Sequence, residues 1–147
     1  MQTSQATVIS SMSAEWLASV RQSGRFGVHD WKQRVTVRVT TMDALIAEYG
    51  QPAFCKLDVE GFESEVLAGL SSAVPALSFE CTPEFLTNTI SCVDRLNELG
   101  HYEYNYNLSE TMRFELADWV SPGQIQQLLR TIDSNTFADV YARIRAI

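Results

Sequence analysis

The sequence predicts a doubly wound α/β domain with a mostly parallel sheet and helices on both faces. Short apolar runs typical of strands alternate with longer stretches of helical periodicity, which is the pattern of βαβ units. The chain has 147 residues, of which 46% are hydrophobic and 20% charged, and one globular domain has this size and composition. Gly61 directly follows an apolar strand and marks a turn from strand to helix.

The first part of the chain is expected to hold two helices and one strand. Val35, Val37 and Val39 alternate with polar residues, and this period of two predicts a half-exposed strand. The helices are expected at residues 14–20 and from a cap at Thr41 to about Tyr49, with a loop at residues 22–32.

The rest of the chain alternates predicted strands with predicted helices. Gly and Pro residues fall at the expected element ends, and the helices carry apolar stripes. Strands are predicted at residues 53–59, 76–81, 102–107 and 137–144, and helices after Gly61, at residues 83–99 and at residues 121–132.

The charge and the cysteine content argue against several classes of protein. Eleven basic residues against 18 acidic ones give a net charge of −7, which disfavours binding to nucleic acid or to an anionic membrane surface. The three cysteines form no CxxC pair, and no apolar run approaches the roughly 20 residues of a membrane span. The chain is therefore expected to be cytoplasmic, with reduced thiols and no metal centre.

Three charged residues at the end of one predicted strand form the candidate site. Lys56, Asp58 and Glu60 alternate with apolar residues, so their side chains point to the same side of the strand. Burying unpaired charges is costly, which favours the carboxyl end of the strand, where open α/β sheets bind ligands. The alternatives are a solvated edge strand with a Lys56–Asp58 ion pair and a metal-dependent hydrolase site at Asp58 and Glu60.

The next predicted strand also ends near an acidic residue. Glu80 follows the apolar run at residues 76–79, and neighbouring strands would bring it beside Asp58 and Glu60. Crowded carboxylates raise one another's pKa, which suits a general base that takes a proton from a hydroxyl or an amine. The simpler alternative is that Glu80 caps the helix that begins at Pro83 or pairs with a surface base.

Several blocks of the sequence resemble the FkbM family of S-adenosylmethionine-dependent methyltransferases, and they occur in the family's order. The most specific block is KLDVEGFE at residues 56–63. It is preceded by VRVTTMDAL at 37–45 and followed by VLAG at 66–69, LSFE at 77–80 and ADVYAR at 138–143. The resemblance covers roughly residues 35–143, and the other blocks are informative mainly through their order.

The resemblance implies a fold, a reaction and a set of site residues. The fold would be a partial Rossmann-like sheet of the class I methyltransferase type. It would bind S-adenosylmethionine and pass a methyl group to a small-molecule acceptor, usually a hydroxyl of a sugar or natural product. Asp58 and Glu60 would be catalytic, with Lys56 orienting them. The implied contacts are Asp58 and Gly61 for the cofactor, and Glu80 and Glu63 for the acceptor.

The glycine-rich cofactor loop of the family has no counterpart in this sequence. The seven glycines form no GxGxxG or GxGxG motif after a strand. We therefore expect a single truncated domain, with residues 1–34 as a loosely ordered remnant of the upstream half. It should bind the cofactor poorly and be inactive alone. The alternative is a non-catalytic α/β module that pairs through an exposed sheet edge with a second copy or a partner.

Overall fold

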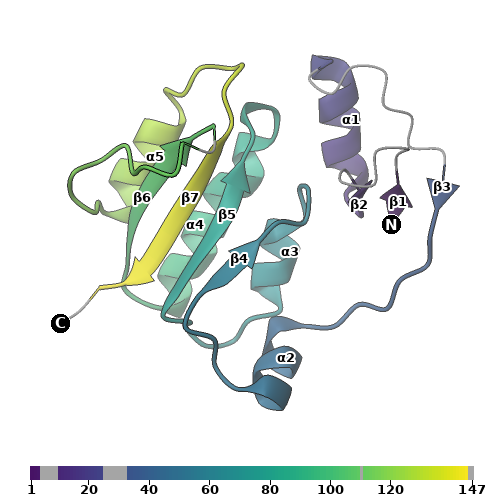
Figure 1. Cartoon of the computed structure of the whole chain (residues 1–147), viewed down its shortest axis with the longest axis horizontal. Coiled ribbons are helices and arrows are strands. Elements are labelled where there is room, and N and C mark those ends of the chain that lie inside the picture. The colour runs from purple at the N-terminus through teal and green to yellow at the C-terminus, as the bar shows by residue number, and fades with distance from the viewer. Residues whose placement is uncertain (4–9, 25–32, 110, 146–147) are drawn as a thin grey trace.

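The computed structural model describes residues 1–3, 10–24, 33–109 and 111–145, which form two sheets and their helices (Figure 1). The smaller sheet lies near the N-terminus. Its strands are β1 (Gln2–Thr3), β2 (Ser10–Ser11) and β3 (Gln33–Arg34), in the order β2-β1-β3 with both pairings antiparallel.

The larger sheet has the strand order β4-β5-β7-β6. Its strands are β4 (Cys55–Leu57), β5 (Ala76–Cys81), β6 (Tyr102–Leu108) and β7 (Ala138–Ile144). β4 is parallel to β5, whereas β7 is antiparallel to both of its neighbours. It follows that β4, β5 and β6 run in the same direction and end at the same edge of the sheet.

The expectation of a mostly parallel sheet is wrong at the level of strand pairing. Two of the three pairings in the larger sheet are antiparallel. The cause is the position of β7, which lies between β5 and β6 rather than at the end of the sheet. Sequence periodicity predicts a strand, but it does not specify where in the sheet that strand inserts.

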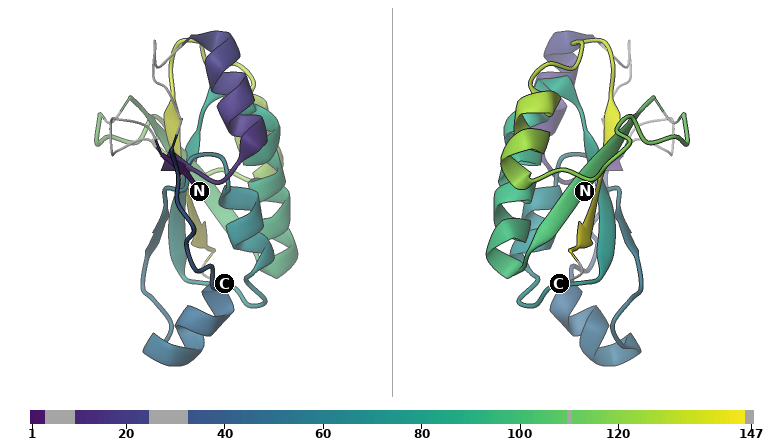
Figure 2. Two further views of the ribbon diagram at one scale, coloured as in Figure 1. Left: turned by 90° about the vertical axis from the view of Figure 1, so that its right-hand side faces the viewer. Right: turned by 90° about the vertical axis from the view of Figure 1, so that its left-hand side faces the viewer.

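The helices of the larger sheet lie on one of its faces (Figure 2). They are α3 (Glu63–Ala68), α4 (Leu86–Leu99), which follows the short 3₁₀ helix η1 (Pro83–Phe85), and α5 (Pro122–Leu129). The chain that follows β6 projects from the opposite face (Figure 2). Among the described residues, the expectation of helices on both faces is therefore wrong.

The core lies between the sheet and these three helices. In β7, Ala138, Val140 and Ala142 are buried against the helices, whereas Asp139 and Tyr141 alternate with them and point the other way. The other fully buried members of this core include Leu67, Leu70, Val74, Leu77, Phe79, Cys92, Val93, Leu96, Tyr104 and Ile125. Alternation along each strand therefore leaves a polar face that carries no helix.

Several predicted elements are confirmed with small changes in length. β5 covers the predicted residues, and α1 (Ala14–Ser23) and α2 (Met42–Tyr49) occur where helices are expected. Thr41 caps α2, because its Oγ1 accepts a hydrogen bond of 3.2 Å from the Ala44 amide. The loop predicted at residues 22–32 falls mostly outside the described residues, and the loose order expected of residues 1–34 stays a prediction. None of the described helices is long and apolar enough to cross a membrane.

The strand predicted at residues 35–39 does not form. Val35 exchanges backbone hydrogen bonds with Met1, but residues 36–40 belong to no sheet among the described parts of the chain. Val35, Val37 and Val39 remain exposed, the last by 70%. A period of two shows that a segment suits a sheet, yet a strand also needs a neighbour with free backbone groups.

Candidate functional site

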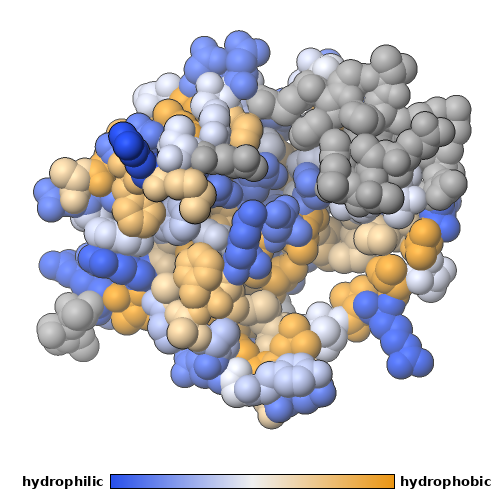
Figure 3. Space-filling model, in the orientation of Figure 1, coloured by the Kyte–Doolittle hydropathy of each residue, from blue (hydrophilic) through white to orange (hydrophobic). Residues whose placement is uncertain are grey.

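A polar cavity of about 590 Å³ opens at the carboxyl ends of β4 and β5. It lies on the helix-free face of the sheet, which Figure 3 views directly and on which hydrophilic and hydrophobic residues are interspersed. The position matches the rule that open α/β sheets bind ligands beyond the carboxyl ends of parallel strands. The lining residues are Lys56, Asp58, Glu60, Glu80, Met112, Phe137, Asp139 and Tyr141.

Lys56 and Asp58 form an ion pair at the mouth of the polar cavity. The Lys56 Nζ lies 3.1 Å from the Asp58 Oδ2, and both side chains are more than half exposed. The hydrogen bond to Asp58 raises the pKa of Lys56. An exposed pair of this kind adds little stability. Its effect is to hold the Lys56 ammonium group against the Asp58 carboxylate at the border of the cavity.

Glu60 and Glu80 are the two carboxyls of the cavity whose pKa values are raised most. Burial raises the pKa of Glu60 to about 7, and the charges of Asp58 and Glu63 add to the shift. Burial also raises the pKa of Glu80 to about 8, followed by the charges of Glu60, Asp58, Glu63 and Asp139. Among the described residues, no hydrogen-bond donor reaches either carboxyl group. Both groups can therefore exchange a proton near neutral pH.

The turn that carries Glu60 is fixed from three elements. The Glu63 Oε1 at the start of α3 accepts hydrogen bonds from the amides of Val59 (3.4 Å) and Gly61 (3.2 Å). The Ser11 hydroxyl of β2 donates to the Glu60 carbonyl at 2.6 Å. Asn88 of α4 donates its side-chain amide to the Gly61 carbonyl at 3.0 Å. The position of Glu60 is thus set by the surrounding fold.

The backbone of this turn also explains the glycine. Glu60 and Gly61 both have positive φ, of 52° and 83° respectively, a conformation in which side chains other than Asn and Asp are uncommon. A Cβ added to Gly61 would overlap the buried Trp16 side chain of α1. Gly61 therefore serves the turn and the packing of α1, and its role in cofactor binding stays a prediction.

An aromatic wall closes the side of the cavity opposite β4. Phe137 and Tyr141 line it, and the Tyr141 ring stacks edge-on against Phe114 with centroids 5.1 Å apart. The Tyr141 hydroxyl accepts a hydrogen bond of 3.4 Å from the side-chain amide of buried Asn107. The wall is therefore held in place by β6 and by the chain that follows it.

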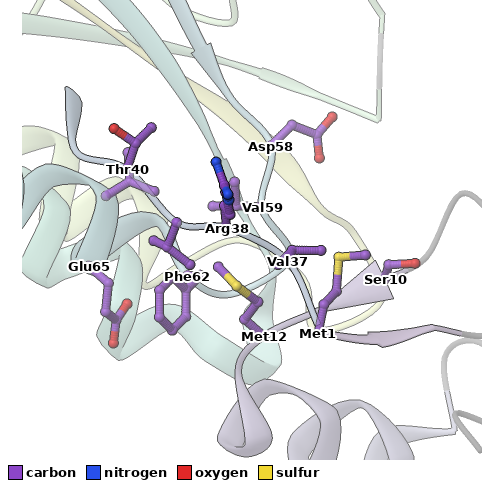
Figure 4. Close-up of a pocket in the computed structure, with 12 residues that line it drawn as sticks. Met1, Ser10, Met12, Val37, Arg38, Thr40, Asp58, Val59, Phe62 and Glu65 are labelled. Atoms are coloured by element: carbon purple, nitrogen blue, oxygen red, sulfur yellow. The ribbon is translucent and has the colours of Figure 1, made fainter. Parts of the chain in front are cut away.

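A second cavity, of about 410 Å³, lies on the other side of Asp58 and is mostly apolar. Figure 4 shows Val37, Met12 and Phe62 gathered around it, with Arg38 and Asp58 at one side. Its lining also includes Met1, Ser10, Val39, Thr40, Val59, Glu65 and Val66. Asp58 lines both cavities, so its carboxylate borders the space for a ligand in either one.

The structure brings together four of the residues that the sequence predicts for the site. Lys56, Asp58, Glu60 and Glu80 share one cavity, because Leu57 pairs with Phe79 in the register of β4 and β5. Glu63 is only 4% exposed and its carboxylate faces the backbone of the turn. Its role in acceptor binding stays a prediction, as do the roles assigned to the other residues.

Sequence reasoning missed the contributions of β7 and of the chain after β6. Asp139 lies opposite Glu80 in the strand register, and Tyr141 follows on the same side. The alternation of residues 137–144 shows that these two side chains share a face, but only the insertion of β7 beside β5 brings them to the cavity. Phe137 and Met112 carry no sequence signal that would have identified them.

The described residues contain no group of three or more His, Cys, Asp or Glu side chains arranged to hold a metal ion. The three cysteines are free thiols, with Cys81 and Cys92 buried. Among the described residues, the charged and aromatic side chains that line the polar cavity are four carboxylates, one lysine and the two residues of the aromatic wall.

Comparison with protein families gives one match. The family model described as the methyltransferase FkbM domain matches residues 2–119, a range that includes Lys56, Asp58, Glu60 and Glu80 and excludes β7. Searches of curated proteins and of solved structures found no match.

Proposed function

The chain belongs to the FkbM methyltransferase family, and we propose that its polar cavity is the acceptor site of a methyl transfer from S-adenosylmethionine. The observation that carries this proposal is the gathering of Asp58, Glu60 and Glu80 around one cavity within the matched range. Carboxyls with raised pKa values that line a cleft are typical of groups that move protons.

The residues around the apolar cavity fit part of the cofactor. Val37, Val59 and Phe62 offer an apolar wall suited to an adenine ring, and Arg38 offers a cation for a carboxylate. When bound, S-adenosylmethionine supplies a methyl group activated by a positively charged sulfur. Asp58 lies between the two cavities, where its carboxylate can stabilise that positive charge at the acceptor side.

The chain's own contribution to the reaction is positioning and proton removal. An acceptor hydroxyl in the polar cavity lies among the Glu60 and Glu80 carboxyls, whose pKa values of about 7 and about 8 suit a general base. A bound methyl donor would supply the methyl group and keep the electron pair of its broken carbon–sulfur bond, and the Glu60 or Glu80 carboxylate would hold the proton that leaves the acceptor hydroxyl. Lys56 holds the Asp58 carboxylate through the ion pair. Orientation of the acceptor against Asp58 supplies the remaining rate enhancement.

Cofactor binding by this chain is expected to be weak. The sequence has no glycine-rich turn after a strand, and such turns supply the backbone amides that hold the polar end of nucleotide-like cofactors. A calorimetric titration should therefore show no binding of S-adenosylmethionine at micromolar concentrations. Micromolar binding would contradict this expectation and would indicate that the apolar cavity is a complete cofactor site.

Transfer of a labelled methyl group tests the proposed function. The full chain is incubated with methyl-labelled S-adenosylmethionine at millimolar concentration, which offsets weak binding by mass action, and with a mixture of sugars, amino sugars and small alcohols. The chain is expected to be inactive at ordinary cofactor concentrations, but at millimolar concentration we expect slow transfer that falls by about a hundredfold in Asp58→Asn. The control Glu48→Gln, exposed on α2 away from the cavity, should match the original chain. Absence of transfer, or transfer unaffected by Asp58→Asn, would contradict the proposal.

A further inference from the structure

The charge around the polar cavity points to a particular class of acceptor. We propose that the acceptor carries a positively charged amine that binds between Glu60, Glu80 and the aromatic wall of Phe137 and Tyr141. This inference rests on the proposed function, because it assigns the substrate class of the same cavity. Acceptors of this class include amino sugars and alkylammonium compounds.

The cavity contains many more anions than cations. Of the residues that the structure describes, Asp58, Glu60, Glu80 and Asp139 line it together with one cation, Lys56. That cation is engaged, since its Nζ lies 3.1 Å from the Asp58 carboxylate. Glu60 and Glu80 are therefore not paired with Lys56 in the way that Asp58 is.

Glu60 and Glu80 have no hydrogen-bond donor from the described residues. Both residues are partly buried, and carboxyls removed from water are usually paired or hydrogen-bonded. Glu63, a few residues away, shows the ordinary solution, because two backbone amides donate to its carboxylate. Within the described parts of the chain, Glu60 and Glu80 thus lack the partner that a bound ammonium group, with up to three N–H donors, would supply.

The aromatic wall adds a second and independent feature that favours a cation. Phe137 and Tyr141 line the same cavity as the carboxyls, and aromatic faces attract ammonium groups, including methylated ones. Tyr141 is also restrained, since Asn107 donates to its hydroxyl and Phe114 packs against its ring. A cation bound in the cavity therefore lies beside aromatic side chains as well as carboxyls.

Proton uptake by the carboxyls gives the inference a pH dependence. Lys56, Asp58 and Glu60 approach the cavity from β4 and its turn, Glu80 from β5, and Asp139 and Tyr141 from β7, with Glu63 of α3 beneath. Burial and mutual repulsion hold the pKa of Glu60 at about 7 and that of Glu80 at about 8. A cation binds the ionised forms, so its affinity should rise as the pH increases from about 6 to about 9.

Binding of choline, compared with its uncharged isostere, tests the inference. In the isostere a tert-butyl group replaces the trimethylammonium group, so shape is kept and charge is lost. Both compounds are titrated into the full chain and followed by NMR chemical shifts at about pH 6 and about pH 9. We expect choline to bind at least about tenfold more tightly than the isostere at the higher pH. The preference should shrink at the lower pH.

Two variants assign the effect to the cavity. Glu60→Gln and Glu80→Gln should each weaken choline binding by about tenfold, because each removes one anion and keeps the side-chain shape. Glu48→Gln, on α2, should leave it unchanged, and NMR spectra will show whether each variant is folded. Equal binding of the two compounds, or no binding of choline, overturns the inference. Asp58-dependent methyl transfer to a neutral acceptor would survive that result, so the two proposals can fail separately.

Discussion

The polar cavity holds the partly buried Glu80 and the turn beneath it holds the buried Glu63, and these two glutamates have different surroundings. Glu63, in the turn, is 4% exposed and accepts hydrogen bonds from the amides of Val59 and Gly61. Glu80, at the cavity, has a raised pKa from burial and from four neighbouring carboxylates. The hydrogen bonds to Glu63 oppose the rise in its pKa that burial causes. Burial alone therefore does not separate a structural carboxylate from a functional one.

The two regions differ in the groups that surround each carboxyl: hydrogen-bond donors around Glu63 and other carboxylates around Glu80. The fold itself supplies the partners of Glu63, so its removal should harm stability. Among the described residues, the charges that raise the pKa of Glu80 are those of other carboxylates, so neutralisation of Glu80 should help stability and harm ligand binding. Each prediction below tests one side of this comparison.

The largest expected effect is in the turn, at Gly61. Gly61→Ala combines a backbone at φ 83° with an overlap against Trp16, and we expect a loss of about 3 kcal/mol in the free energy of unfolding. Gly24→Ala is the matched control. Gly24 also has positive φ, 71°, but has no atom near the added Cβ, so its loss should be about 1 kcal/mol. Denaturant titration measures both, and equal losses would show that Trp16 does not pack as described.

Removal of the turn carboxylate is expected to have the next largest effect. Glu63→Ala leaves the amides of Val59 and Gly61 without their acceptor and should lower the free energy of unfolding by about 2 kcal/mol. Glu65→Ala, two residues along the same helix and exposed, should change it by less than about 0.5 kcal/mol. If both variants unfold at the same denaturant concentration, Glu63 does not hold the turn.

Neutralisation of the cavity carboxyl should act in the opposite direction and depend on pH. The pKa of Glu80 is raised from an ordinary 4.5 to about 8, so ionisation disfavours the folded state. The original chain should lose stability as the pH rises from about 4.5 through about 8, and Glu80→Gln should not share that loss. The variant should be more stable by about 1 kcal/mol at about pH 9 and equal at about pH 4. Thermal unfolding across this range measures the difference, and a destabilised variant at high pH would break the comparison.

The smallest expected effect concerns the conformation of Glu60. Its φ of 52° suits Asn better than Glu, and substitution also removes one of the crowded charges. Glu60→Asn should therefore raise the free energy of unfolding by about 0.5 kcal/mol at neutral pH. A loss of stability would mean that the Glu60 side chain makes a favourable contact that the comparison leaves out.

The sequence predicts the local elements of this protein better than their arrangement. Thr41 and the capping box at Ser121 mark helix starts that the structure contains, because caps depend on neighbours a few residues away. The strand order, with β7 beside β5, depends on contacts between distant segments. For the same reason Val35, Val37 and Val39 satisfy the strand pattern and still lack a sheet.

Prediction of the candidate site follows the same division. Lys56, Asp58 and Glu60 could be identified because their alternation with apolar residues predicts a common side, although β4 ends at Leu57 and Glu60 lies in the turn that follows. Glu80 could be identified because it lies near the end of the next strand, β5. Asp139 and Tyr141 could not, since they join the cavity only through the pairing of β7 with β5. The partners of Glu63 are backbone amides. Every residue type except proline has such an amide, so the sequence does not show whether Glu63 binds the backbone or a ligand.

The most direct test of the account is an NMR titration of the side-chain carboxyl carbons of Glu60 and Glu80 in the full chain. The central claim is that these two groups are partly desolvated, crowded by other carboxylates and, within the part of the chain that the structure describes, without a hydrogen-bond donor at the polar cavity. The account predicts midpoints near the pKa values of about 7 for Glu60 and about 8 for Glu80, and a downward shift of both when choline is added. Midpoints near the ordinary value of about 4.5 for both groups would contradict it.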